Sequence, residues 1–352
     1  MNRREAMFVI AAGAAAPWLD SAADAKKPNC QLGIADFSYA IRKRAERAGD
    51  PPKQVSDPLG LLKHCHQIGA GGMQCGLGHR DASYTARLRN FAEHSGLFIE
   101  GSTSLPRDAQ DVERFDAHLR TAGAAGAKVI RIAIGGRRYE QFDKLDEFGA
   151  FAERSWKSMQ LAAPVAERHG LRLAIENHKD FRAPELLRML EQLDSEYVGI
   201  CLDTGNSIAL LEDPVEIIHT WTPWAKSVHL KDMALCEYEE GFLLADVVLG
   251  EGVLDLPTIV TNMRKAHPDI RFSLEMATRD PLKVPCLTAN YWATMPDVSG
   301  AELARTLRFV RANAREEESL PHVSHLPVAE QIRIEEENIR QCLCYASEHL
   351  GL

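Results

Sequence analysis

The feature that most constrains the fold is an alternation of short apolar runs with longer amphipathic segments, which begins near residue 31 and continues past residue 270. This pattern predicts strand–helix units that form a parallel sheet. Proline at an expected first helical turn, in Asp57-Pro58, and glycine after an expected helix end, at Gly170, support the division into units. The predicted strands are residues 31–40, 72–77, 97–102, 128–134, 171–177, 197–203, 225–231 and 271–277, and the predicted helices include residues 58–68, 112–125, 148–168, 184–193, 214–220 and 256–266.

Eight strand–helix units predict an α/β fold of the (β/α)8 TIM-barrel type. A doubly wound open sheet is the main alternative, but no Gly-x-Gly-x-x-Gly motif follows the first strand. Residues 332–350 lie beyond the eight units and predict an added amphipathic helix, which could cover the barrel or a second subunit. We therefore expect a barrel over residues 31–316 and a C-terminal helical extension over residues 317–352.

Residues 1–30 have the order of an export signal. Arg3 and Arg4 precede an apolar, alanine-rich run over residues 6–17, and Ala-Asp-Ala at 23–25 offers small residues for cleavage. The run is too short to span a bilayer core of about 30 Å. We expect a twin-arginine signal peptide and linker, no membrane segment after processing, and a periplasmic or otherwise exported protein. The alternative is an N-terminal tail on a cytoplasmic protein.

The composition is typical of a folded domain, with 45% hydrophobic and 26% charged residues, and it argues against disorder. The net charge of -9 opposes nucleic-acid binding, which depends on clustered Lys and Arg. The 8 cysteines are scattered, without the paired spacings of a disulfide framework or a zinc ribbon. We expect a small-molecule partner and no nucleic acid, and the sequence leaves a homo-oligomer open.

Carboxylate or imidazole side chains stand at the ends of the last four predicted strands, at Glu176, Asp203, His229 and Glu275. Alternation along each strand predicts that all four point into the barrel, where the carboxyl ends of the strands converge. Any one of these carboxylates could instead be a helix cap or half of an ion pair. Three acids buried together without a cation would be strongly destabilising, however, so the set predicts one divalent cation. We expect Mn²⁺, and Mg²⁺, Co²⁺ and Zn²⁺ are compatible with the same ligands.

Five segments at or near the strand ends form an ordered pattern: Ile-Glu-Asn-His at 175–178, Leu-Asp-Thr-Gly-Asn at 202–206, Val-His-Leu-Lys-Asp at 228–232, Gly-Glu-Gly-Val-Leu-Asp at 250–255 and Leu-Glu at 274–275. In order and spacing these segments resemble the xylose-isomerase-like TIM-barrel superfamily of sugar phosphate isomerases and epimerases. The resemblance implies that Glu176, Asp203, His229 and Glu275 bind one divalent ion. It also implies that Glu176 and Glu275 act as acid and base on opposite faces of a bound ketose.

The pattern departs from that of the ketose 3-epimerases in this superfamily, because Asn206 stands where they usually have His and no Arg follows the metal-binding His within residues 232–238. The expected activity is that of a divalent-metal-dependent sugar isomerase or epimerase, which removes the proton next to a carbonyl to form an enediolate. The same site could expel a β-substituent, so a 3-keto-glycoside lyase or hydrolase is the alternative. A non-catalytic sugar-binding protein would be expected to have lost Glu176 or Glu275, and an abasic-site nuclease would need more His ligands and a basic rim.

Four further side chains are candidates for substrate contact. His178 and Lys231 share the parity of the ligand residues on their strands but lie two residues farther out, where they would reach a sugar. The alternatives are a hydrogen bond to a ligand for His178 and an ion pair with a mouth carboxylate such as Asp232 for Lys231. Asn206 is predicted to bind sugar hydroxyls or loop backbone. Trp292 lies in a long loop that could form a lid, where it would stack on a sugar or pack the loop down.

Overall fold

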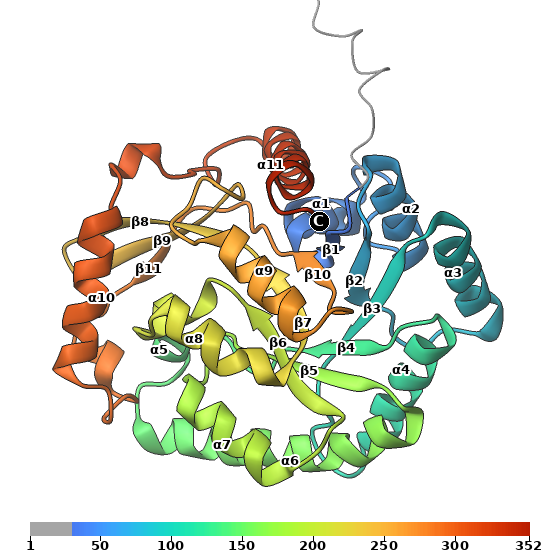
Figure 1. The fold of residues 1–352 in the computed structure, drawn as a ribbon, viewed down its shortest axis with the longest axis horizontal. Helices are drawn as coiled ribbons and strands as arrows, with labels where there is room; N and C mark the ends of the chain where they lie inside the picture. The colour runs from blue at the N-terminus through green and yellow to red at the C-terminus, as the bar shows by residue number, and fades with distance from the viewer. Residues whose placement is uncertain (1–29) are drawn as a thin grey trace, which may run out of the picture.

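Eight parallel strands form a closed barrel in the computed structural model, which describes residues 30–352 (Figure 1). Neighbouring strands follow the order β1-β10-β7-β6-β5-β4-β3-β2, which confirms the predicted (β/α)8 barrel. All eight predicted strands are present. They are β1 (Gly33–Ala35), β2 (Gly72–Gly76), β3 (Phe98–Thr103), β4 (Val129–Ile132), β5 (Arg172–Glu176), β6 (Val198–Asp203), β7 (Ala225–Leu230) and β10 (Phe272–Leu274).

The predicted twin-arginine signal falls on residues 1–29, which lie outside the described residues, so it stays a prediction. Within residues 30–352, no helix combines the length and the apolar composition that a membrane crossing requires. Export and a periplasmic location therefore depend on the sequence pattern alone.

Helices surround the barrel, and several begin or end at the residues expected from the sequence (Figure 1). Asp57 caps α2 by accepting a hydrogen bond from the backbone N–H of Gly60 (3.1 Å), and Pro58 is the first helical residue. Gly170, with a φ of 61°, ends α6. The helices are α1 (Ala40–Ala48), α2 (Pro58–Ile68), α3 (Ala82–Ser95), α4 (Val112–Ala124), α5 (Arg138–Gln141), α6 (Leu145–His169), α7 (Ala183–Leu193), α8 (Pro214–Trp221), α9 (Leu256–Ala266), α10 (Gly300–Asn313) and α11 (Val328–His349).

The first strand is shorter than the predicted 31–40. Its expected last residues form a 3-10 turn, Asp36–Tyr39, that leads into α1. The turn is tied to the neighbouring strand, because Ser38 Oγ donates to the carbonyl of Leu274 (2.9 Å) and accepts from the backbone N–H of Met276 (3.1 Å). The Ser38 hydroxyl thus forms the hydrogen bonds with backbone groups at the end of β10 that a longer first strand would have formed.

A second, three-stranded antiparallel sheet extends from the carboxyl end of β7, in the order β11-β9-β8 (Figure 1). Its strands are β8 (Asp232–Tyr238), β9 (Gly241–Val247) and β11 (Leu282–Val284). β8 and β9 form the hairpin that lengthens the seventh unit, whereas β11 lies in the long loop after β10, residues 278–296. Arg279 in this loop donates to Asp246 Oδ2 on β9 (2.9 Å). The loop that the sequence offers as a lid is therefore paired to the hairpin.

The last helix packs on the barrel. α11 lies beside α1 (Figure 1), and its residues Ile339 and Leu343 are buried in the main hydrophobic cluster. The carboxylate of Glu335, which is 1% exposed, accepts hydrogen bonds from the backbone N–H groups of Ile41 (2.8 Å) and Arg42 (3.0 Å) at the start of α1. Of the two arrangements predicted for this helix, the one that covers the barrel is present.

Replacing Glu335 by alanine should lower the free energy of unfolding by about 1–3 kcal/mol, because two backbone donors at the start of α1 lose their buried acceptor. Chemical denaturation would measure the change. Glu337→Ala is the matched control, since Glu337 lies on the same helix but is exposed, and its loss should cost less than about 0.5 kcal/mol. Equal losses in the two variants would contradict this role of Glu335.

Candidate metal centre

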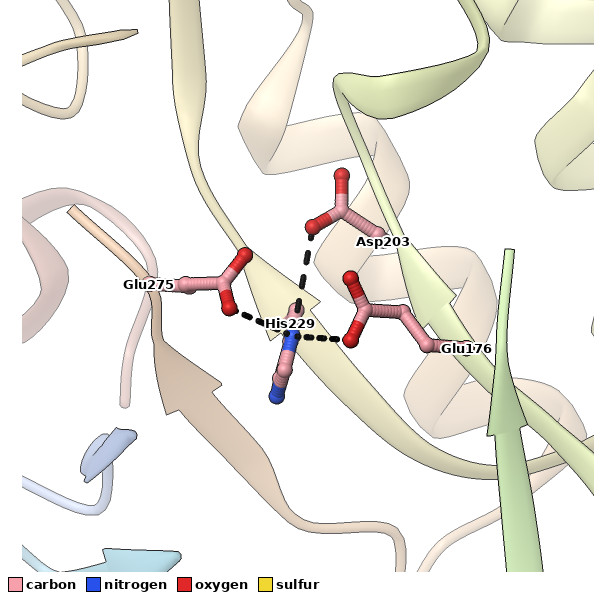
Figure 2. A group of neighbouring side chains, drawn as sticks. All are labelled: Glu176, Asp203, His229 and Glu275. Carbon is pink, nitrogen blue, oxygen red and sulfur yellow. Dashed lines mark ion pairs between the residues drawn. The ribbon is translucent and has the colours of Figure 1, made fainter. Parts of the chain in front are cut away.

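Four ligand-type side chains converge at the carboxyl end of the barrel (Figure 2). Glu176 ends β5, Asp203 ends β6, His229 lies near the end of β7, and Glu275 directly follows β10. One ligand atom from each residue lies within 4.8 Å of the others, and all four residues are buried. Inward positions of adjacent strands are neighbours, as the pairing of Asp203 with His229 shows. The convergence predicted from strand parity is therefore present.

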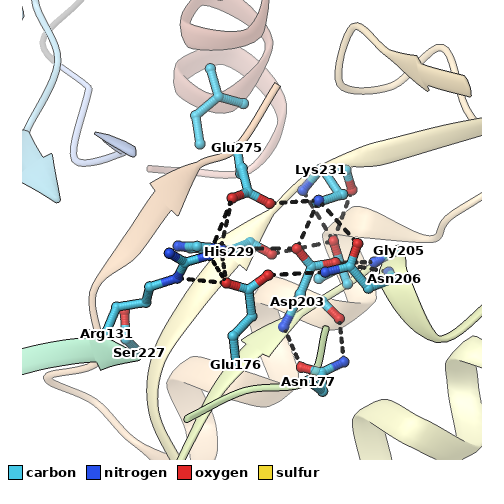
Figure 3. Close-up of polar contacts among 12 residues, drawn as sticks. Arg131, Glu176, Asn177, Asp203, Gly205, Asn206, Ser227, His229, Lys231 and Glu275 are labelled. Atoms are coloured by element: carbon cyan, nitrogen blue, oxygen red, sulfur yellow. Dashed lines mark hydrogen bonds and ion pairs between the residues drawn. The ribbon is translucent and has the colours of Figure 1, made fainter. Parts of the chain in front are cut away.

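The loop after β6 fixes the direction of the Asp203 carboxylate. Its Oδ1 accepts hydrogen bonds from the backbone N–H groups of Gly205 (3.0 Å) and Asn206 (2.8 Å). Asn177 holds the same residue from β5, since its amide donates to the Asp203 carbonyl (3.0 Å) and accepts from the Asp203 N–H (2.7 Å) (Figure 3). Asp203 Oδ2 is buried, 2.8 Å from Nζ of Lys231 and 3.9 Å from Nδ1 of His229.

The ring of His229 is also held in one orientation. Its Nε2 lies 2.6 Å from Oε1 of Gln74, whose amide nitrogen donates to Glu100 (2.8 Å). Because Oε1 can only accept, Nε2 carries a proton, and Nδ1 points at the three carboxylates, 3.5 to 3.9 Å away. Nδ1 has no hydrogen-bond partner within residues 30–352. A metal-binding histidine usually donates its other N–H to an oxygen in this way.

The group fits a divalent cation. Nδ1 of His229, which has no hydrogen-bond partner in the described part of the chain, faces three carboxylates in a buried space. Burial lowers the pKa of His229, but Cys201 and Glu275 more than offset this effect, and the pKa lies well above its ordinary value. The cluster thus attracts positive charge to this nitrogen, which a divalent ion would supply. Three carboxylates and one imidazole are ligands that suit Mg²⁺ or Mn²⁺.

Arg131 was not predicted from the strand ends. It points from β4 into the mouth, where its Nε donates to Glu176 Oε2 (2.6 Å) and its Nη2 lies 3.9 Å from Glu275 Oε1 (Figure 3). Burial lowers the pKa of Arg131, but the two carboxylates raise it more, so the guanidinium stays charged. A signal was present in the sequence, because Arg131 interrupts the apolar run Val-Ile-Arg-Ile at a position that alternation turns inward.

Lys231 lies among the carboxylates. Its Nζ is 2.7 Å from Glu275 Oε2 and 2.8 Å from Asp203 Oδ2. These charges raise the pKa of Lys231, although burial alone would lower it. The predicted ion pair with mouth carboxylates is present, but Asp232 is not the partner. Asp232 instead accepts hydrogen bonds from backbone N–H groups of its own hairpin and of the loop that follows β9.

Asn206 connects the acids to two lysines. Its Nδ2 donates to Glu176 Oε1 (3.1 Å), and its Oδ1 accepts from Lys179 and, at 3.4 Å, from Lys231. Lys179, another residue that was not predicted, is buried, and burial together with Lys231 lowers its pKa to about 8. The Asn206 side chain is therefore engaged inside the site, and its contact with a sugar stays a prediction.

The other two predicted contact residues differ in their surroundings. His178 is half-buried, its Nδ1 has no partner among the described residues, and burial lowers its pKa to about 4, so the ring is neutral. Trp292 makes contacts within the loop after β10, where its indole N–H donates to the carbonyl of Cys286 (2.9 Å) and its ring meets Tyr291 edge-on (5.5 Å between centroids). This packing favours the second alternative for Trp292, and its stacking on a sugar stays a prediction.

A family model described as a xylose isomerase-like TIM barrel matches residues 62–305. The chain belongs to this family. Among its relatives, 3-oxo-isoapionate decarboxylase of Pectobacterium atrosepticum is 28% identical over 254 residues, which are 69% of this chain and 85% of that protein. Inosose dehydratase 1 of Bacillus cereus is 26% identical over 282 residues, which are 73% of this chain and 92% of that protein.

Solved structures of xylose isomerase-like proteins share the fold at low sequence identity. A family member from Mycobacterium smegmatis in complex with magnesium has a TM-score of 0.52 and 17% identity, and the match covers 79% of this chain and 98% of that one. The apo form of 3-keto-D-glucoside 4-epimerase from E. coli has a TM-score of 0.52 and 13% identity, with the same coverage of 79% and 98%. The relatives with named activities thus comprise a decarboxylase, a dehydratase and an epimerase.

Replacing Gln74 by leucine should lower the affinity for a divalent ion about tenfold to a hundredfold, because His229 loses the acceptor that fixes its ring and its protonated nitrogen. Titration of the metal-free protein with Mn²⁺ would measure the change. Gln160→Leu, an exposed position on α6, is the matched control and should bind the ion as the unaltered protein does. Unchanged affinity in the Gln74 variant would indicate that this orientation of His229 does not contribute to metal binding.

Proposed function

We propose that the protein is a divalent-metal-dependent enzyme that forms an enediolate from a small keto sugar, with Glu176, Asp203, His229 and Glu275 as ligands of one ion. The observation that carries the proposal is the buried Nδ1 of His229, which has no hydrogen-bond partner in the described part of the chain and faces oxygens of Glu176, Asp203 and Glu275 at 3.5 to 3.9 Å. A cluster that served only the fold would be expected to satisfy this nitrogen. We expect Mn²⁺ as the ion, with Mg²⁺ as the next candidate.

When bound, the ion would stabilise the negative charge that develops on the carbonyl and hydroxyl oxygens of the substrate as the intervening C–H loses its proton. Glu176 and Glu275 lie on opposite sides of His229 (Figure 2), so one carboxylate can remove a proton and the other can return one to the opposite face. That exchange is epimerisation, and return of the proton to the adjacent carbon is isomerisation. Burial raises the pKa of both glutamates, but Arg131 beside Glu176 and Lys231 beside Glu275 lower it more, so either can act as the base. The glutamate that returns a proton must first take one up from solvent or from a donor such as Lys231, whose Nζ lies 2.7 Å from Glu275 Oε2.

Substrate hydroxyls would be bound by side chains next to the acids. We assign this role to Lys231, Asn206 and His178, whose polar groups lie at or beside the cluster. His178 is suited to accept a hydroxyl proton, because its neutral ring has an unpartnered Nδ1 in the described structure. Trp292 would reach the substrate only from the loop after β10, where it would cover a sugar face.

Elimination is the second candidate, as a 3-keto-glycoside lyase or hydrolase. The same enediolate can expel a group β to the carbonyl instead of regaining a proton. The relatives named as a decarboxylase and a dehydratase match over 85% and 92% of their own lengths, and these names describe the loss of a group from the substrate. Asn206, in place of the usual His of the 3-epimerases, is a further argument against a plain 3-epimerase.

Deuterium uptake from solvent tests the proposal. Protein loaded with Mn²⁺ would be incubated in D₂O with methyl 3-keto-glucoside and with D-fructose, and the products would be followed by NMR. We expect deuterium at the carbon next to the carbonyl, and exchange should fall by about a hundredfold or more in Glu275→Gln. An inverted centre in an intact molecule supports an epimerase, and released methanol supports a lyase or hydrolase. Metal binding without exchange on any ketone would contradict the proposal and favour a sugar-binding protein.

A further inference from the structure

A cavity of about 590 Å³ lies at the amino end of the barrel, opposite the candidate metal centre. Its wall includes residues at the starts of several barrel strands and residues at the carboxyl ends of α3, α4 and α9. No group in this cavity takes part in the proposed reaction. The lining residues that matter here are Lys128, Arg172, Lys226 and Arg271, with Phe98 and Glu100 toward the barrel interior.

Two of these cations belong to the inner layer of the barrel. Arg172 has the parity of Glu176 on β5, and Arg271, just before β10, has the parity of Glu275. Arg271 also lies over the ring of Phe98, 5.4 Å from its centroid, at the end of the barrel. The two arginines thus face the barrel axis at its amino end, as the two glutamates face it at the carboxyl end.

Basic groups outnumber acids in the wall of the cavity, which contains five Lys and Arg residues beside Glu93, Glu100 and Asp269. One of the five, Arg89, pairs with Glu93 (3.9 Å). Lys128, Arg172, Lys226 and Arg271 form no ion pair within 4 Å among the residues that the structure describes. Burial together with the neighbouring Arg172 lowers the pKa of Lys226. Helix carboxyl ends favour nearby cations, but Arg172 and Arg271 point from strands toward the axis. Four cations without an ion-pair partner, which together outnumber the three carboxylates of the wall in a chain of net charge -9, indicate a site for an anion.

Glu100 offers a hydrogen-bond acceptor at the inner end of the cavity. It follows Phe98 by two positions on β3, which places it about 7 Å farther into the barrel at the usual rise of a strand. Its Oε2 accepts from Gln74 (2.8 Å) and Ser227 (2.7 Å), while Oε1 is buried without a hydrogen-bond partner in the described residues. Such an oxygen can bind a hydroxyl group of a ligand.

We propose that this cavity binds a small hydroxylated anion, either a sugar phosphate or a sugar acid. Its anionic group lies on Arg172 and Arg271, and one of its hydroxyl groups bonds to Glu100 Oε1. The volume of about 590 Å³ falls within the range of small-molecule sites, roughly 300–1,000 Å³. The site requires neither the metal nor the proposed reaction, so the two proposals stand or fall separately.

Isothermal titration calorimetry at low ionic strength tests the site, with the full chain and four probes: D-glucose 6-phosphate, D-gluconate, inorganic phosphate and D-glucose. We expect glucose 6-phosphate or gluconate to bind at least tenfold more tightly than either inorganic phosphate or glucose. Whichever of glucose 6-phosphate and gluconate binds more tightly identifies the preferred anionic group as phosphate or carboxylate. In the double variant Arg172→Gln/Arg271→Gln, this affinity should fall at least tenfold.

The matched control is Arg47→Gln/Lys53→Gln, which removes the same charge from exposed positions outside the cavity and should change the affinity less than twofold. Lys226→Gln, a single change in the cavity wall, should weaken binding at least threefold even if the double variant fails to fold. Absence of binding by both hydroxylated anions would overturn the proposal. So would binding that survives in the folded cavity variants, or an equal loss in the control.

Discussion

Alanine in place of His229 is expected to leave the purified protein without its divalent ion and to lower Mn²⁺ affinity by more than about a hundredfold. Loss of a residue that only supports a metal ligand can already lower the affinity about a hundredfold, and loss of the ligand itself should cost more. His229 offers the only nitrogen of the group, and its Nδ1 faces all three carboxylates at 3.5 to 3.9 Å. Loss of this ligand also removes the one member of the group that is not an acid. Elemental analysis of the purified protein and titration of its metal-free form would measure the change.

His66→Ala is the control for this experiment, because His66 is an exposed histidine on α2 and outside the cluster. It should retain the metal content of the unaltered protein. A His229 variant that still holds one ion per chain with unchanged affinity would show that the four residues are not the ligand set.

Methionine in place of Lys231 is expected to lower the free energy of unfolding by about 3–5 kcal/mol when metal is absent, the usual effect of removing one partner of a buried ion pair. Lys231 is 3% exposed, and its Nζ is within 2.8 Å of carboxylate oxygens of Asp203 and Glu275, which would be left unpaired. A divalent ion among the same oxygens would supply the missing charge. The loss should therefore be clearly smaller in Mn²⁺ than in EDTA, as measured by denaturant unfolding.

Lys157→Met is the control for the Lys231 variant. Lys157 pairs with Glu153 at 2.6 Å on the exposed face of α6, so its removal should cost less than about 1 kcal/mol with or without metal. An equal loss of stability for Lys231→Met in Mn²⁺ and in EDTA would indicate that no ion occupies the space among the carboxylates.

Strand parity explains why much of the site could be predicted. Glu176, Asp203, His229 and Glu275 stand at the carboxyl ends of apolar strands, and the two-residue period of a strand decides the direction of each side chain. A closed barrel then leaves only one place where they can meet. Arg131 obeys the same rule on β4, but a guanidinium does not bind metal ions, so a pattern of ligand residues does not include it.

Contacts between segments far apart in the chain could not be predicted. The spacing between the last two strands shows an insertion, but β11 pairs with β9 from beyond the final barrel strand. Local sequence contains no signal for such a partner. Ser38 is a similar case, because its hydrogen bonds to the end of β10 shorten the first strand through residues more than 230 positions away. Lys179 follows a strand in a loop, where parity gives no direction.

The sheet of β8, β9 and β11 has a consequence for how this protein could diversify. Leu244 of β9 and Val284 of β11 belong to a buried cluster separate from the main core, and Arg279 joins the two segments through Asp246. The sheet borders the mouth, since Asp246 of β9 lies 3.9 Å from Nζ of Lys231, and it therefore gives this side of the mouth its own source of stability. During evolution the hairpin and its partner loop could be replaced together. This would change which molecules enter the mouth, while the eight strands and the residues at their carboxyl ends stay the same.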